Sequence, residues 1–407
     1  MTVQGLSFIS SAPSAESTLP PLQPGCRIVV TIPAKDEEAY ILPCLRALLA
    51  QRQLDGAPLD RCLYAVLVLA NNCTDQTALL ARRLARDEPG FQLFVVERDF
   101  PPSEARVGLA RKIMMDAAAL ALPEEGIIAT TDADTRVDEY WIAATLRAFD
   151  RGARAVGGRI VVPPSPRSGY RRTHLQDVTY RSLVSLLESM VDPDPDDPWP
   201  RHFQHYGPSL AVSRAAYLAC GGMPPLAAIE DAAFGWALER IDVNFVHDPA
   251  VKVFTSDRDS ERIAGVAFSS SLREWTRMAT EAREPAVIGL AHALQLIKWK
   301  VALRRAYRDR RVTGLPALES LTQHLGISLD ALQRTIGLAP SFGSLYLDLR
   351  NRIVNQPGFS DRTYGEAIAE LRRFTRGGRG GRSSSKRPAG NDRSGARVRG
   401  TRLSAAG

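Results

Sequence analysis

The chain has 407 residues, of which 44% are hydrophobic and 24% are charged, and this balance excludes a chain that is disordered throughout. Its formal charge of +7 is concentrated in residues 376–407, which hold nine arginines and lysines against one aspartate, +8 in total, leaving about −1 for residues 1–375. The positive charge is therefore no argument that the folded part binds nucleic acid.

The cysteines and the apolar segments bear on where the protein works. Five cysteines occur at irregular spacings, an odd number that indicates free thiols in a reducing compartment. The first residues lack the charged leader and long apolar block of a secretory signal. No apolar run approaches the roughly 18–20 residues that cross a bilayer. We therefore expect a cytoplasmic protein that is soluble or peripheral to a membrane.

Strands and helices are predicted to alternate after a flexible Ser- and Pro-rich leader at residues 1–25. The β-branched run 27–34 predicts a strand, and the helical spacing of apolar residues over 37–51 predicts a helix. The same alternation continues with strands at 63–70, 91–97 and 126–134, separated by helices at 75–87 and 109–121. Such a pattern predicts an α/β fold with a parallel sheet that helices cover on both faces.

The second half of the chain is predicted to be mainly helical. A helix at 175–190 precedes an acidic, Pro-rich loop, amphipathic helices follow at 269–311, and a helical cluster covers 317–371. The last residues contain too few apolar side chains to fold. We therefore expect four regions, which are a leader at 1–25, an α/β domain at 26–260, a helical region at 261–375 and a disordered tail at 376–407.

Acidic residues follow the predicted strands, at the edge where ligands bind to parallel sheets. KDEE follows the first strand, NNCTDQT the second and TDADT the fourth. Asp132 and Asp134 would repel each other at the end of a buried strand unless a hard cation lay beside them. Mg²⁺ or Mn²⁺, held by carboxylates and substrate phosphates, meets this requirement. A solvated turn or a helix start is the alternative interpretation of the triplet.

Five segments of the chain resemble the family 2 glycosyltransferases, which have the GT-A fold. They occur in the family's order over about residues 27–258 and read TIPAKDEEAYILPCLRALLAQ, VLVLANNCTDQTALLARRLA, ARVGLARKIMMDAA, TTDADT and AIEDAAFGWALER. The resemblance implies a Rossmann-like, mostly parallel sheet flanked by helices. It also implies transfer of a sugar from a nucleoside-diphosphate donor to a hydroxyl acceptor, which is a glycan, a lipid-linked acceptor or a small molecule. We expect inversion at the anomeric carbon, with retention left open.

By this resemblance, five residues bind the donor in addition to Asp132. Pro33, Ala34 and Glu37 are expected beside the nucleoside, although acids here also favour a helix N-terminus. Asn71 stands where many relatives have an acid, and its amide can hydrogen-bond a base edge. Arg111 is our choice among three cations at 106–112 for contact with the diphosphate. A surface salt bridge is the alternative role for Arg111.

The resemblance also assigns the metal ligands and the base. Asp134 and Asp132 are the expected metal ligands, and the third ligand is left open with Asp257 as a candidate. Asp231 matches the family's base position, with Glu230 as a second candidate for removing the proton of the acceptor hydroxyl. Capping of the helix that follows is the structural alternative for this acidic pair.

Other polar residues have structural interpretations. Asp75 and Thr77 are expected to begin a helix, and His247 is expected to stabilise a turn. A cluster of aromatic residues forms either a wall for the acceptor or a packed loop, and its histidines do not make a zinc site; its members are Trp199, His202, His205 and Tyr206.

Three other functions compete with this interpretation. A nucleotidyltransferase would need a Gly-rich triphosphate loop after the first strand, where this chain has acids. RNA binding by the tail would lack stacking, because residues 377–407 contain no aromatic side chain. A contact of the tail with solvent or anionic lipid is the better expectation, so nucleic acid is not an expected partner. Nucleotide binding without turnover is the third alternative, and the intact aspartates argue against it.

Overall fold

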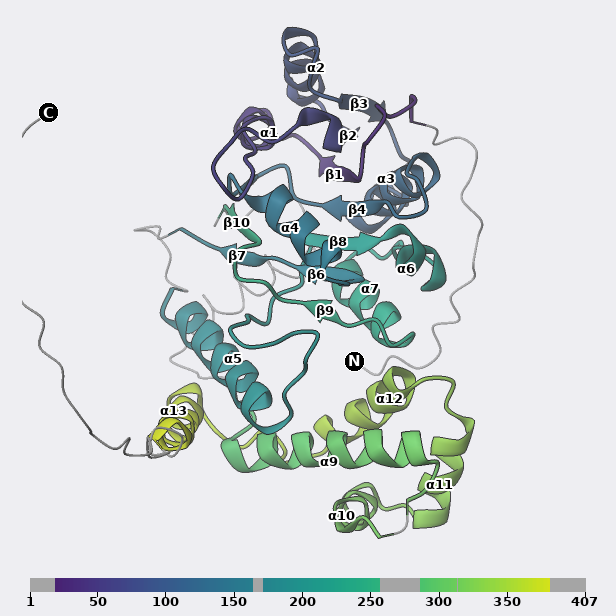
Figure 1. Cartoon of the computed structure of the whole chain (residues 1–407), viewed down its shortest axis with the longest axis vertical. Coiled ribbons are helices and arrows are strands. Elements are labelled where there is room, and N and C mark those ends of the chain that lie inside the picture. The colour runs from purple at the N-terminus through teal and green to yellow at the C-terminus, as the bar shows by residue number, and fades with distance from the viewer. Residues whose placement is uncertain (1–18, 164–170, 257–285, 313, 381–407) are drawn as a thin grey trace, which may run out of the picture.

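A seven-stranded sheet forms the centre of the protein (Figure 1). The computed structural model describes residues 19–163, 171–256, 286–312 and 314–380. The strand order is β3-β2-β1-β4-β8-β6-β9. The strands are β1 (Ile28–Ala34), β2 (Tyr64–Asn71), β3 (Leu93–Arg98), β4 (Ile127–Thr130), β6 (Ala155–Gly157), β8 (Leu210–Ser213) and β9 (Phe245–Val246).

Most of the strand pairs are parallel, as expected. β1 pairs in parallel with β2 on one side and with β4 on the other, and β2 pairs in parallel with β3. β8 is the exception, because it runs antiparallel to both β4 and β6. β4 ends at Thr130, so the acidic triplet lies in the loop that follows rather than inside the strand.

Alternating side chains of the strands build one apolar core on each face of the sheet. In β1, Ile28, Val30 and Ile32 lie in one core, and Val29 lies in the other. The first core is covered by α1 (Ile41–Leu49), α2 (Thr77–Asp87) and α4 (Trp141–Asp150). The second core is covered by α3 (Val107–Ala121), α6 (Arg214–Ala219) and α7 (Glu230–Glu239). The expected α/β class, with helices on both faces, is confirmed.

A small second sheet lies beside the acidic loop. It consists of β5 (Thr135–Val137), β10 (Lys252–Thr255) and β7 (Arg159–Val161). β10 runs antiparallel to β5 and parallel to β7. Because β5 begins directly after Asp134, this sheet fixes the end of the acidic loop.

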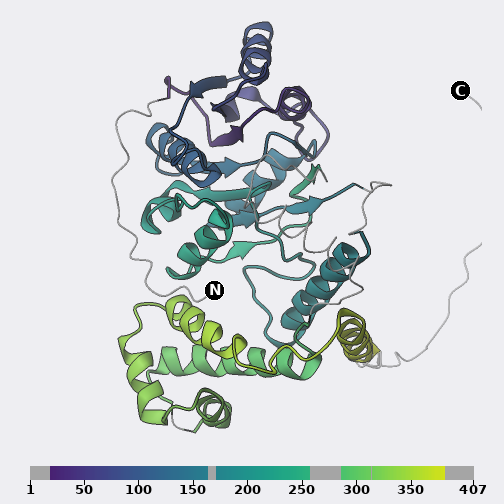
Figure 2. The same cartoon turned by 180° about the vertical axis from the view of Figure 1, so that it is seen from behind.

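The C-terminal part is helical, also as expected, and has a core of its own (Figure 2). This core joins α9 (Leu290–Asp309), α10 (Pro316–Leu325), α11 (Leu329–Leu338) and α12 (Phe342–Val354). A smaller cluster joins α5 (Arg171–Val191), α9 and α13 (Tyr364–Gly380). None of the helices in the described ranges combines the length and the apolar composition that a bilayer span requires.

The helical region contacts the α/β part where α12 meets the end of α7. Ser341 Oγ donates a hydrogen bond to the carbonyl of Arg240 at 2.5 Å, and the amide of Gly343 donates to Asp242 Oδ1 at 2.7 Å. The backbones approach so closely that a Cβ atom on Gly343 would lie 1.7 Å from the carbonyl oxygen of Glu239. Only glycine fits this contact.

Gly343→Ala is therefore expected to lower the free energy of unfolding by about 1–3 kcal/mol, because the added methyl overpacks the contact. Gly337→Ala is the matched control, since Gly337 is also helical but a Cβ there meets no atom within 4 Å. The control should gain about 0.5–1 kcal/mol from helix propensity. Urea denaturation of both variants measures the difference, and equal midpoints would contradict the close contact.

Candidate functional site

A buried arginine joins the acids that the sequence placed far apart. Arg111 lies on α3 and its side chain is 4% exposed. Its Nε donates to Glu230 Oε1 at 3.2 Å, its Nη1 donates to Thr130 Oγ1 at 2.6 Å, and its Nη2 donates to Asp132 Oδ1. Nη1 also reaches the carbonyl of Gly207 at 3.5 Å. Arg111 thus connects α3, the end of β4 and the start of α7.

The electrostatics of this cluster leave an excess of negative charge. Burial raises the pKa of Asp132, Arg111 opposes this rise, and the nearby Asp134 raises the pKa further. Burial also raises the pKa of Glu230, and the positive charge of Arg111 opposes this rise. Burial would lower the pKa of Arg111, but Asp132 and Glu230 outweigh it and raise that pKa. One guanidinium therefore faces several carboxylates, and an added cation would relieve their repulsion.

The small second sheet orients Asp134. Thr135 pairs with Thr255 in the β5–β10 ladder, and the Thr135 hydroxyl donates to the Thr255 hydroxyl at 2.9 Å. The next residue, Ser256, donates a hydrogen bond from Oγ to Asp134 Oδ2. This contact depends on the long-range pairing of β10 with β5, which the local sequence does not predict. Asp257, the candidate third ligand, lies outside the described residues.

The two aspartates of the triplet have the chemistry that a divalent cation requires. They flank the buried Ala133, and the side chain of Asp132 is 29% exposed, so it is accessible from solvent. Arg111 bonds Oδ1 of Asp132, and a carboxylate has a second oxygen. Carboxylate oxygens are the ligands that Mg²⁺ and Mn²⁺ prefer. The residues present therefore fit a divalent cation.

A loop over residues 204–209 holds Asp231 beside this cluster. The amide of Gly207 donates to Asp231 Oδ2 at 2.9 Å, and its carbonyl accepts from Arg111. Thr131 Oγ1 donates to the carbonyl of Pro208 at 2.8 Å. A Cβ on Gly207 would lie 2.6 Å from Nη2 of Arg111, so the loop can approach this closely only with glycine. Nothing in the local sequence predicts these contacts of Gly207.

The two acidic residues that start α7 differ in burial. Glu230 is 6% exposed and turned toward Arg111, whereas Asp231 is only partly buried. Asp231 Oδ1 also accepts from the amide of Ala232 at 2.7 Å, within the first turn of the helix. The preceding residue, Ile229, has a φ of 58°, a left-handed conformation that is strained for a β-branched side chain. Such strain is concentrated at ligand sites.

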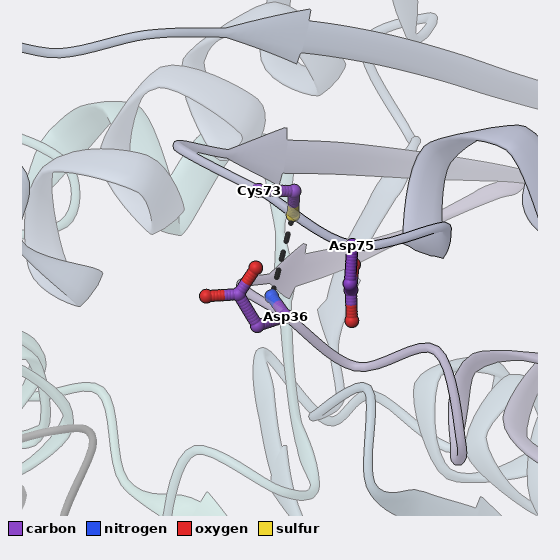
Figure 3. A group of neighbouring side chains, drawn as sticks. All are labelled: Asp36, Cys73 and Asp75. Carbon is purple, nitrogen blue, oxygen red and sulfur yellow. Dashed lines mark hydrogen bonds between the residues drawn. The ribbon is translucent and has the colours of Figure 1, made fainter.

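Three ligand-type side chains meet between the loops that follow β1 and β2. Asp36, Cys73 and Asp75 form the trio in the described ranges whose ligand atoms all lie within 4.8 Å of one another (Figure 3). The amide of Asp36 donates to Cys73 Sγ at 3.4 Å, and Asp36 Oδ1 accepts from the amide of Thr74 at 2.7 Å. Asp75 Oδ2 accepts from the amide of Glu38 at 3.0 Å. Each side chain thus bonds the opposite or adjacent loop.

These contacts argue that the trio fastens the two loops rather than holding a metal. Burial raises the pKa of the Cys73 thiol, and a metal-binding cysteine must be a thiolate. Asp75 Oδ1 accepts from both the amide and the hydroxyl of Thr77, at 2.9 and 2.5 Å. Burial would raise the pKa of Asp75, but the hydrogen bonds from Thr77 lower it. Asp75 and Thr77 lie at the start of α2, where the sequence placed them.

The residues expected at the donor lie along one edge of the sheet. Pro33 and Ala34 end β1, and Ala34 pairs with Ala70, which directly precedes Asn71. Asn71 is 6% exposed, and its Oδ1 has no hydrogen-bond partner within the described parts of the chain. Glu37 is 9% exposed, and its amide donates to Thr77 Oγ1 at 2.7 Å. Because β1 lies between β2 and β4, these residues share the edge that carries the acidic triplet.

The aromatic cluster of the sequence analysis divides into a packed part and an exposed part. His247 bonds Oδ2 of Asp197 through Nδ1 at 2.9 Å, and its Nε2 lies 3.2 Å from Nδ1 of His205. The ring of His205 stacks on Phe245 with centroids 4.7 Å apart. Trp199, by contrast, is 43% exposed. The histidines therefore support the loop that holds Asp231, and Trp199 is left at the surface.

Stability is expected to fall as the pH drops from about 6.5 toward 5. Burial lowers the pKa of His202 and His205 to about 3, so both are neutral in the folded protein and bind protons only when it unfolds. Because the folded-state pKa lies below the unfolded value, the two histidines cost no stability above about pH 6.5. Below that pH the free energy of unfolding declines, by about 1–2 kcal/mol per histidine at pH 5. Urea denaturation across this range measures the slope. A His202→Gln/His205→Asn variant with an equally steep slope would contradict the assignment.

Two solved structures illustrate the comparison with known proteins. TarS 1-349 of S. aureus in complex with UDP-GlcNAc is 15% identical, with a TM-score of 0.41 over 86% of this chain and 92% of that one. The mannosyltransferase PcManGT from Pyrobaculum calidifontis, in complex with GDP-Man and Mn²⁺, is 16% identical, with a TM-score of 0.41 over 90% of each chain. A comparison with curated proteins gives no match.

One family model matches part of the chain. Residues 29–214 match the model described as Glycosyl transferase family 2. This range contains β1 through β8, the acidic triplet, Arg111 and Gly207. Over residues 29–214, the chain is similar to glycosyltransferase family 2.

Proposed function

We propose that the protein transfers a sugar from a nucleoside-diphosphate donor to a hydroxyl acceptor, with Mg²⁺ or Mn²⁺ bound at Asp132 and Asp134 and with inversion at the anomeric carbon. The observation that carries this proposal is the convergence of two carboxylate sets on Arg111. The triplet after β4 contributes Asp132, and the start of α7 contributes Glu230. The match of residues 29–214 to the family model supports sugar transfer, and the position of the carboxylates supports the metal.

The charge of the donor explains why the triplet is needed. Asp132 and Asp134 would hold the cation, which when bound supplies Lewis-acid stabilisation to a departing diphosphate. Arg111 keeps Asp132 oriented and offsets part of the carboxylate repulsion. Ser256 orients Asp134 from the neighbouring strand.

Asp231 is proposed as the base that acts on the acceptor. Its carboxylate would take the proton of the acceptor hydroxyl while that oxygen bonds to the anomeric carbon and the nucleoside diphosphate leaves with the bonding pair. The Gly207 amide holds Asp231 Oδ2 in place, and the buried Glu230 is committed to Arg111. We therefore favour Asp231 over Glu230 for this role.

The donor's base and ribose are proposed to lie at the ends of β1 and β2. The buried Oδ1 of Asn71 can accept an N–H of the base, which would satisfy an atom that lacks a partner among the described residues. Pro33, Ala34 and Glu37 lie on the adjacent strand end. The five cysteines are free thiols, which supports our inference of a cytoplasmic enzyme. The domain limits at residues 26–260 and 261–375 are part of the same proposal.

A thermal-shift screen tests this function. Native protein is heated with UDP-, GDP- or dTDP-sugars, each with and without Mn²⁺, because a ligand of the folded state raises the midpoint. We expect one nucleotide class to stabilise the wild type only with Mn²⁺, and an Asp134→Ala variant to lose that dependence. The control is Asp150→Asn, an exposed acid paired with Arg27 far from the triplet. No stabilisation by any donor in the presence of Mn²⁺ would contradict the proposal.

A further inference from the structure

A cationic groove lies between α5 and α13, apart from the candidate active site. It has a volume of about 670 Å³ and is lined by Arg171, Arg172 and Arg372 together with the apolar Leu175 and Ile368. Figures 1 and 2 show α5 and α13 side by side, below the seven-stranded sheet and away from α2. The described residues that line the groove are different from those of the candidate active site.

The arginines of the groove are not neutralised by the protein. All three are exposed, and in the described part of the chain none of them makes an ion pair. Arg181, on the same helix, shows the contrasting case, because it bonds Asp177 at 2.9 Å. Within the described ranges, no acidic residue lines the groove. Its net charge of three positive charges calls for an anionic partner.

The apolar residues of the groove favour a lipid surface over nucleic acid as the anionic partner. Leu175 is 50% exposed beside the arginines, which places a large aliphatic side chain where it would reach the acyl boundary of a bilayer. Among the described residues that line the groove none is aromatic, so these residues offer nucleic-acid bases no ring on which to stack. Basic side chains around an exposed leucine are typical of a membrane-surface site.

The sequence beyond the groove adds charge of the same sign. Residues 376–407 carry nine basic residues and one acid. This segment begins four residues after Arg372 in the sequence. Basic residues that follow one another closely in a sequence attract an anionic leaflet.

We propose that the face formed by Arg171, Arg172, Leu175 and Arg372 binds the surface of a bilayer that contains anionic phospholipid. The guanidinium groups contact lipid phosphates, and Leu175 inserts among the headgroups. Such attachment would bring the enzyme to acceptors that reside in or on a membrane, and this consequence rests on the proposed function. Binding to the bilayer itself does not depend on the proposed function.

Co-sedimentation of the full-length protein with vesicles tests this proposal without any donor or acceptor. The wild type is expected to bind vesicles of phosphatidylcholine with phosphatidylglycerol, to ignore pure phosphatidylcholine, and to be released by salt. The triple variant R171Q/R172Q/R372Q should partition roughly ten- to a hundredfold more weakly, since each basic residue near the surface contributes separately. The tail is present in every protein compared.

A matched control separates this site from overall charge. The triple variant R46Q/R83Q/R86Q removes the same charge from exposed positions on α1 and α2. We expect it to bind vesicles as the wild type does. Equal binding by the groove variant and the wild type, or equal weakening in both triple variants, would overturn the proposal. Retention of single-stranded RNA by the wild type, lost in the groove variant while vesicle binding persists, would overturn it in favour of RNA.

Discussion

Asp231→Asn is expected to lower the rate of sugar transfer by about 10²–10⁴-fold, because an amide cannot take the proton of the acceptor hydroxyl. Donor affinity should change little, since the proposed donor contacts lie at the ends of β1, β2 and β4. The amide oxygen of asparagine can still accept from the Gly207 amide, and only the bond from the Ala232 amide is lost, so the fold should be retained. Steady-state kinetics with the donor identified by thermal shift gives the turnover, and calorimetry gives the affinity.

Glu230→Gln separates the two candidates for the base. Glu230 is bonded to Arg111 inside the protein, so its substitution is expected to lower stability more than turnover. Asp150→Asn serves as the control for charge removal at a remote, exposed position. Wild-type turnover in Asp231→Asn, together with a large loss in Glu230→Gln, would transfer the role of base to Glu230.

Arg111→Met is expected to lower the free energy of unfolding by about 3–5 kcal/mol, because it leaves the buried carboxylate partners without a counter-charge. Asp132 and Glu230 both lose a charged hydrogen bond, and Glu230 is 6% exposed. Methionine keeps the length of the side chain while removing its charge. Denaturant unfolding measures the loss.

Lys112→Met is the matched control for this change. Lys112 is the next residue on α3, and its ammonium group pairs with Asp116 one turn along the same helix, at 2.9 Å. An intrahelical pair of this kind contributes less than about 1 kcal/mol. A loss in Arg111→Met no larger than that in Lys112→Met would show that the arginine does not hold the acids together.

The bounds of the central strands could be predicted closely because their residues form continuous β-branched or apolar runs. The β-branched run at 27–34 forms β1 (Ile28–Ala34), and the apolar run at 63–70 forms β2 (Tyr64–Asn71), in which every residue is buried. Strands buried on both faces read as continuous apolar segments. The alternation with helices then implied parallel pairing, which β1, β2, β3 and β4 show.

The short strands and the antiparallel pairing could not be predicted in this way. β5 and β7 have three residues each, too few to show any periodicity. The direction of β8 depends on its partners β4 and β6 rather than on its own residues. The predicted strand at 126–134 is too long, because β4 ends at Thr130 and the chain then turns, with the Thr135 amide bonding the carbonyl of Asp132.

The acidic residues of the candidate site could be predicted from the sequence, but the residues that hydrogen-bond them could not. Carboxylates after parallel strands must gather at one edge, so Asp132 and Asp134 followed from the pattern. Arg111 and Glu230 lie 119 residues apart, and nothing in the local sequence pairs them. The same holds for Gly207, whose neighbours reveal no contact with Asp231. Long-range packing decides these contacts.

Electron paramagnetic resonance of Mn²⁺ provides the most direct test of the proposed metal site. Native protein is titrated with Mn²⁺ alone, with UDP and with GDP, and the spectrum distinguishes aqueous from bound ion. We expect bound Mn²⁺ when the matching nucleoside diphosphate is present, and its loss in an Asp132→Asn/Asp134→Asn variant that remains folded. Mn²⁺ binding that persists unchanged in this variant, or that never occurs with either diphosphate, would contradict a cation held at the end of β4.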